Sequence, residues 1–134
     1  MDTSPVVQII RQKFEEGGGT AHIPNLKKRY FTAKLVDGGV DVDNLGSLPF
    51  LSWQVFHEAI GLLIRNGGRA KKGNAMNARL GDRGLPSSTI EGYIAQTVYG
   101  KRAGEWVFRR ITPISCILVW AGVCEAEPNE LVLK

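Results

Sequence analysis

The sequence has little from which a metal or nucleophile centre could be built. Its 134 residues include two cysteines and two histidines. Cys116 and Cys124 lack the spacing of metal ligands and stand among apolar residues. His57 has no second histidine or cysteine near it in the sequence. We therefore expect two buried free thiols, no metal and no cofactor.

Long apolar runs are also missing. The longest, residues 114–124, is much shorter than the roughly 20 residues that a membrane-spanning helix needs. The N-terminal stretch MDTSPVVQ lacks a basic region followed by an apolar segment. These features predict a soluble, cytoplasmic protein. The length fits one domain, or a compact domain with a short N-terminal attachment, and the hydrophobic content of 43% is enough for a core.

No motif of a common enzyme class is complete. The glycine run at residues 17–19 has no lysine or serine after it at the spacing of a phosphate-binding loop. Asp41 and Asp43 alternate with Val40 and Val42, which is typical of a strand with one face to the core and one to water. The sequence offers neither a nucleophile with a base nor a nuclease-like set of carboxylates and lysine. We predict that the chain is not an enzyme.

The positive charge is concentrated in one part of the chain. Residues 1–64 carry six basic and seven acidic residues, and residues 111–134 carry one and three. Residues 65–110 carry ten basic and three acidic residues, so this segment holds all of the net positive charge. If these side chains share a face they attract a polyanion. The alternative is a solvated basic surface without a ligand.

The N-terminal half predicts three elements. Ser4 and Pro5 suit the start of a helix that residues 17–19 end. Alternating apolar residues on either side of the turn at 37–39 predict a hairpin that pairs residues 30–36 with 40–43. Ser52 can then cap a strong helix. Its apolar stripe consists of Trp53, Phe56, Ala59, Ile60, Leu63 and Ile64.

The C-terminal half predicts three further helices and a second hairpin. The helices cover residues 72–80, 88–98 and 112–121, and the hairpin pairs 123–126 with 131–133. Ser88 with Glu91 has the spacing of a capping box, and Thr112 with Pro113 that of a helix start. The order helix, hairpin, four helices, hairpin predicts an α+β fold that is mainly helical.

Two segments, VFHEAIGLLIRNGGRAKKGNAMNARLGD and VFRRITPISCILVWAGVCEAEPNELVLK, carry a family resemblance. Together with Phe108 and the WAGV step that begins at Trp120, they resemble the N-terminal DNA-binding module of Mrr-type restriction proteins. The resemblance implies a winged helix-turn-helix over residues 52–134, preceded by a helix and a β-hairpin. It also implies duplex DNA as partner and a setting in restriction, mobile-element or transcriptional control. The turn EPNE is acidic, so the wing tip is not expected to approach phosphates closely.

The basic and hydroxyl residues divide by expected role, because phosphate contacts position a protein on DNA and base contacts specify sequence. The expected phosphate contacts are Arg69, Lys71, Lys72, Lys101 and Arg102. Around the helix after Arg109–Arg110, the expected contacts to bases or phosphates are Arg109, Arg110, Thr112 and Ser115. A competing helix-turn-helix over residues 74–95 assigns base reading to Ser87, Ser88 and Thr89 instead.

Several alternatives stand beside this reading. Arg109 and Arg110 can simply pair with Glu91 or Glu105. Another class of function is protein docking, since winged helices also serve as docking folds. The chain could also be a non-catalytic accessory subunit of a nuclease complex. Residues 1–51 could mediate a homodimer or bind a partner protein.

Overall fold

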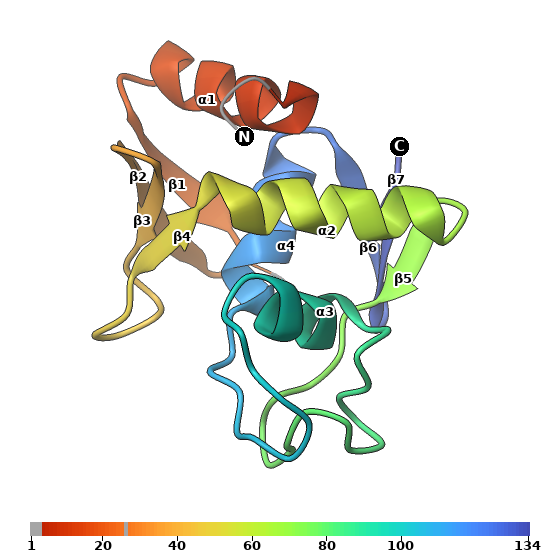
Figure 1. Cartoon of the computed structure of the whole chain (residues 1–134). Helices are drawn as coiled ribbons and strands as arrows, with labels where there is room; N and C mark the ends of the chain where they lie inside the picture. The colour runs from red at the N-terminus through yellow and green to blue at the C-terminus, as the bar shows by residue number, and fades with distance from the viewer. Residues whose placement is uncertain (1–3, 26) are drawn as a thin grey trace.

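The computed structural model describes residues 4–25 and 27–134, which form four helices and two antiparallel sheets (Figure 1). The chain is 33% helical and 25% strand. The prediction of a mainly helical fold is therefore wrong, because strands were missed in both halves of the chain. The correct class is α+β with one sheet in each half.

The first helix, α1 (Pro5–Glu16), forms where it was predicted, with Ser4 as N-cap and proline in its first turn. The Ser4 hydroxyl does not cap the helix and instead hydrogen bonds to Nδ1 of His57 at 3.0 Å. Val7, Ile10 and Phe14 are fully buried on one face of α1. This face packs on the helix α2 (Trp53–Arg65) and on the N-terminal sheet.

The N-terminal sheet has four strands in chain order: β1 (Thr20–Pro24), β2 (Tyr30–Val36), β3 (Gly39–Val42) and β4 (Phe50–Ser52). The predicted hairpin is confirmed as β2 and β3, with Val36 opposite Gly39. The outer strands β1 and β4 were not predicted. β4 is too short to show a period of two. It pairs closely with β3 because Gly39 has no side chain to meet the Leu51 carbonyl.

The central helix α2 confirms the strongest helix prediction. It runs across the middle of the molecule, with α1 on one side and α3 (Ile90–Thr97) on the other (Figure 1). Trp53, Phe56, Ala59 and Leu63 are buried as its stripe predicted, whereas Ile64 is 63% exposed.

The C-terminal sheet joins three strands in the order β5–β7–β6, all antiparallel. The predicted hairpin is confirmed as β6 (Cys124–Glu127) and β7 (Glu130–Leu133). The third strand, β5 (Arg69–Lys71), follows α2 directly and pairs with β7. The sequence of β5, Arg-Ala-Lys, is too short and too polar to predict a strand. It is recognised as a strand only because it pairs with β7.

The helix predicted at residues 72–80 is wrong. This segment forms a turn-rich loop in which Gly73 and Asn77 have positive φ angles of 81° and 61°. The Asn74 side chain accepts a hydrogen bond from the Met76 backbone N–H at 3.0 Å. Such local side-chain bonds compete with helix formation. Among the described residues, one isolated β-bridge connects this segment to the chain after α3. It pairs Arg79 with Trp106.

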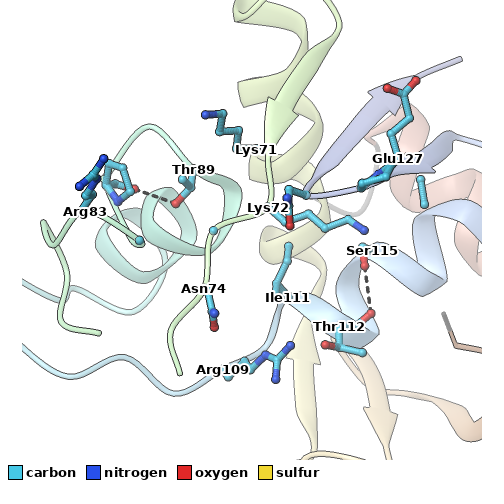
Figure 2. Close-up of a pocket in the computed structure, with 16 residues that line it drawn as sticks. Lys71, Lys72, Asn74, Arg83, Thr89, Arg109, Ile111, Thr112, Ser115 and Glu127 are labelled. Atoms are coloured by element: carbon cyan, nitrogen blue, oxygen red, sulfur yellow. Dashed lines mark hydrogen bonds between the residues drawn. The ribbon is translucent and has the colours of Figure 1, made fainter. Parts of the chain in front are cut away.

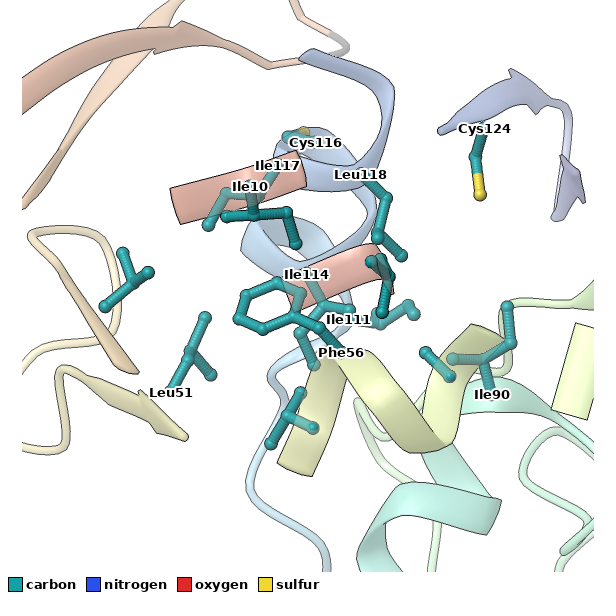
Figure 3. Close-up of a cluster of buried hydrophobic side chains, with 14 of the residues drawn as sticks. Ile10, Leu51, Phe56, Ile90, Ile111, Ile114, Cys116, Ile117, Leu118 and Cys124 are labelled. Atoms are coloured by element: carbon teal, nitrogen blue, oxygen red, sulfur yellow. The ribbon is translucent and has the colours of Figure 1, made fainter. Parts of the chain in front are cut away.

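One hydrophobic cluster connects the two sheets and the four helices (Figure 3). Ile10 and Leu51 from the N-terminal part lie in the same cluster as Ile90, Ile114 and Leu118. The helix α4 (Ile111–Trp120) is the most deeply buried of the four described helices, since residues 113–118 are all buried. Residues 1–51 and 52–134 thus share a core.

The remaining predictions about burial can be checked directly. Cys116 and Cys124 are both buried and are not joined in a disulfide, as predicted. Within residues 4–25 and 27–134, no helix combines the length and the apolar character needed to cross a membrane.

Candidate functional site

A cavity of about 680 Å³ lies where the start of α4, the β6–β7 turn and the loop after β5 meet (Figure 2). Lys71 and Lys72 come from the end of β5, and Arg83 from the following loop. Arg109 and Thr112 come from the chain at the start of α4. The cavity therefore collects basic side chains from three separate stretches of the sequence.

The cavity is electropositive because its cations outnumber its acids. Four basic side chains line it, Lys71, Lys72, Arg83 and Arg109, against the single carboxylate of Glu127. In the part of the chain that the structure describes, ion pairs within 4.0 Å involve Arg69 alone, so the four cavity cations have no carboxylate partner. Lys72 is half-buried, and burial lowers the pKa of its ammonium group.

Backbone hydrogen bonds hold the cavity walls in place. The Lys72 backbone N–H donates to the Asn129 carbonyl at 2.8 Å, which fastens the loop after β5 to the β6–β7 turn. The Lys72 carbonyl in turn accepts the backbone N–H of Glu91 at 2.9 Å. Gly73, with φ of 81°, packs so tightly on Thr89 that a β-carbon would lie 2.5 Å from its hydroxyl oxygen. The wall has no room for a larger residue at position 73.

Thr89 is the N-cap of α3, whereas the sequence predicted Ser88. Its hydroxyl oxygen accepts the backbone N–H of Gly92 at 3.1 Å and donates to the Pro86 carbonyl at 2.7 Å. The predicted capping box is wrong because the Glu91 carboxylate bonds to a different helix.

That carboxylate caps α4 from a distance. Glu91 accepts the backbone N–H groups of Arg110 and Ile111, with Arg110 as the N-cap residue instead of the predicted Thr112. Glu91 is 3% exposed, and burial raises the pKa of its carboxyl to about 7, although both backbone donors and the nearby charges of Arg110 and Arg109 oppose this rise. An anion at a helix N-terminus is also favoured by the helix dipole.

Six residues predicted to contact DNA line the same cavity. They are Lys71, Lys72, Thr89, Arg109, Thr112 and Ser115. Two of them have their hydroxyl groups engaged within the protein. Ser115 is 2% exposed and donates to the Thr112 carbonyl at 3.1 Å, and Thr89 caps α3. The charged members and Thr112 are the ones available to a ligand.

The other predicted residues do not line the cavity. They are Arg69, Ser87, Ser88, Lys101, Arg102 and Arg110. Arg69 pairs with Glu130 at 3.3 Å and with Glu127 at 3.9 Å. Arg110 packs its guanidinium over the rings of Tyr99 and Phe108, at 3.7 and 4.7 Å from their centroids. It does not pair through its side chain with Glu91, which bonds to its backbone.

Sequence reasoning missed Arg83 and Asn74 as cavity residues. Asn74 lies in the segment that was wrongly predicted to be a helix, and Arg83 lies in the turn that follows it. The sequence therefore did not indicate where their side chains point. The turn signal around Arg83 was the sequence GDRGLP.

α4 does not present an exposed polar face of the kind that reads a DNA groove, and the exposed polar residues of α3 are Gln96 and Thr97 at its C-terminal end. In α4, Val119 is the exposed residue, and Thr112 and Trp120 are half-buried. The exposed polar groups of the site lie on the surrounding loops. The arrangement is therefore suited to holding an anionic group at the cavity more than to reading base edges from a helix.

No protein-family model, curated protein or solved structure matches the chain. The site must be interpreted from its own chemistry. Among the described residues, no group of three or more His, Cys, Asp or Glu side chains is placed to hold a metal ion.

Proposed function

We propose that the protein binds duplex DNA through its phosphates, with the cavity and its rim as the contact surface. The observation that carries this proposal is that Lys71, Lys72, Arg83 and Arg109 all line one concave surface, where none of them forms an ion pair within 4.0 Å with a described carboxylate. These cations give the surface an excess of positive charge, which attracts a polyanion. Phosphate contacts of this kind are independent of base sequence and release counterions.

We propose that contacts to DNA bases contribute less to binding than contacts to phosphates. Arg109 is exposed at the cavity and is the candidate for a guanine contact. Arg110 is assigned a structural role, because its guanidinium packs on Tyr99 and Phe108. Among the acidic residues of the β6–β7 hairpin, Glu127 lines the cavity, so the hairpin contributes a wall and one opposing charge instead of cations.

The resemblance to Mrr-type modules supports the same proposal. From α2 onward the elements run helix, strand, helix, helix and hairpin, with the strand β5 paired to β7. On the resemblance alone we propose a setting in restriction, mobile-element or transcriptional control. The same resemblance is the ground on which we propose a cytoplasmic location in a prokaryotic cell.

The test is a fluorescence-anisotropy titration of a random 20-base-pair duplex at several salt concentrations. We expect log K to fall linearly with log salt, with a slope of roughly −0.9 for each phosphate neutralised. Replacing Lys71, Lys72 and Arg83 together by alanine should weaken binding strongly and flatten the slope. The matched control replaces Lys28, Arg29 and Lys34, which lie outside the cavity. Equal losses in both variants, or no binding at low salt, would overturn the proposal.

Protein docking through the N-terminal part is a second candidate, favoured by exposed apolar side chains. Tyr30 is 70%, Leu48 48% and Phe50 45% exposed on this part of the chain. Such residues are enriched in interfaces when they lie together. A homodimer, or a nuclease subunit bound as partner, would bury them. Sedimentation of the wild type and of a Tyr30→Ser variant tests self-association, and a monomer at all concentrations would contradict it.

A further inference from the structure

We infer that the cavity binds a phosphomonoester, such as the terminal phosphate of a DNA strand, in preference to the phosphodiesters of a continuous backbone. This inference rests on the proposed function and specifies its ligand. The same chemistry is present in a free nucleoside monophosphate, so both sources are tested below.

The first support is the charge of the cavity. Its lining has four cations and the single carboxylate of Glu127. A phosphomonoester carries about −1.5 to −2 charges at pH 7 and three strong acceptor oxygens. A backbone phosphodiester carries one negative charge. The dianion therefore neutralises more of the excess positive charge in the cavity.

The second support is shape. The volume of about 680 Å³ falls within the range of roughly 300–1,000 Å³ that is typical of small-molecule sites. Its walls are the turn at residues 127–129 and the loop at residues 83–86, and the turn is fastened to the backbone of Lys72. A continuous duplex, whose major groove alone is about 12 Å wide, cannot enter such a cavity. A strand end or a single nucleotide can.

The third support is the kind of side chain in the lining. The described residues around the cavity include no aromatic ring on which a base could stack. Polar and basic groups face it instead, including Asn74, Asn129 and Thr112. Recognition therefore falls on the phosphate, and the identity of the base contributes little.

Lys72 is the centre of this recognition. It is half-buried, and Figure 2 shows its side chain reaching across the cavity toward Ser115 on α4. A partly desolvated ammonium group without a carboxylate partner gains more from a bound anion than an exposed one does. Arg109 and Arg83 supply planar donors that match phosphate oxygens.

The experiment compares four ligands with the full chain. They are a blunt duplex with 5′-phosphates, the same duplex with 5′-hydroxyl ends, a closed circular duplex, and adenosine monophosphate as a competitor. We expect the phosphorylated duplex to bind roughly tenfold more tightly than the hydroxyl-ended one, as one charge-assisted contact implies. The closed circle should compete as weakly as the hydroxyl-ended duplex.

Variants connect this preference to the cavity. Lys72→Ala should abolish the difference between phosphate and hydroxyl ends, Lys72→Arg should retain most of it, and Lys34→Ala outside the cavity should leave it unchanged. Thermal melting by circular dichroism shows whether each variant is folded. If Lys72→Ala does not fold, Arg109→Ala provides the same comparison from the exposed rim.

The outcomes separate the inference from the proposed function. Equal affinity for both duplex ends, with no competition by the nucleotide, overturns the inference and leaves DNA binding in place. Binding of the nucleotide without binding of any duplex supports the cavity inference with a free nucleotide as ligand and overturns the proposed function. Absence of binding to all four ligands overturns both.

Discussion

The carboxylate of Glu91 accepts the backbone N–H of Arg110 at 2.9 Å, across 19 residues of sequence. This bond ties α3 to the start of α4, and the flanking residues Arg109 and Thr112 both line the cavity. One buried carboxylate thus holds the chain segment that brings a cation and a hydroxyl to the candidate site.

Stability should depend on pH through Glu91. Burial raises the pKa of its carboxyl to about 7 from 4.5, so the folded protein keeps this proton up to about pH 7, whereas the unfolded chain releases it near pH 4.5. Between these values the folded state binds more protons, and the free energy of unfolding falls as pH rises, by roughly 3 kcal/mol at most. Urea denaturation at pH 5, 6, 7 and 8 measures this decline.

The variant Glu91→Gln isolates the effect, because the amide oxygen still accepts one backbone N–H and does not titrate. Its stability should change much less between pH 5 and 7 than that of the wild type. Glu125→Gln, at an exposed position on β6, is the matched control and should retain the wild-type slope. A slope that survives in Glu91→Gln would assign it to other groups.

Arg109 and Arg110 should behave differently although they are neighbours. Arg109→Ala removes an exposed cation at the cavity and should weaken duplex binding and reduce the salt slope by about 0.9. Arg110→Ala removes the packing on Tyr99 and Phe108 and should lower stability by about 1 kcal/mol, with a smaller change in the salt slope. Salt-series anisotropy and urea denaturation of both variants measure the two effects. The reverse pattern would show that Arg110 is the ligand contact.

Replacing Gly92 by alanine should destabilise the protein despite its position inside α3. Alanine normally stabilises a helix interior by about 1 kcal/mol relative to glycine. At Gly92 the added β-carbon would collide with the backbone carbonyl of Pro86, which cannot move aside freely. We expect a loss of about 1–3 kcal/mol.

Gly61→Ala is the control for this effect. In α2 the nearest atom to a new β-carbon is the end of the Arg65 side chain at 3.3 Å, and a flexible side chain can adjust. Gly61→Ala should be neutral or stabilising, by up to about 1 kcal/mol. Thermal melting of both variants side by side tests the difference in sign.

The two thiols should be unreactive in the folded state. Cys124 is 1% exposed and burial raises its pKa to about 12, and Cys116 is 4% exposed. The thiolate is the reactive form, so a thiol reagent at pH 8 should modify both cysteines slowly until denaturant is added. Rapid modification of the native protein would show that the core around α4 opens easily.

Local sequence patterns were sufficient to predict an element where its apolar residues recur with the period of a helix or strand, or where a turn motif marks a hairpin. The stripe of α2, the hairpin β2–β3 around its Asp-Gly-Gly turn and the hairpin β6–β7 were all predicted from residues close together in sequence. The strands β4 and β5 were missed because each has three residues and depends on a partner that lies elsewhere in the chain.

The candidate site was predicted only in part, because it also depends on segments that are far apart in the sequence. The sequence determined that residues 65–110 hold the excess positive charge and that Arg109 and Thr112 stand at a helix start. It could not show that Lys71, Arg83 and Arg109 face one cavity, since they belong to separate segments.

The sequence alone thus determined the amphipathic helices, the tight turns and the location of the charge, because these depend on neighbours within a few residues. The tertiary structure decided which cations line the cavity, that Glu91 caps α4 and that Arg110 packs on aromatic rings. Each of these depends on contacts between segments brought together by the shared core. The tertiary structure also buries residues 113–118 of α4, which the local pattern placed on a helix but could not place in the core.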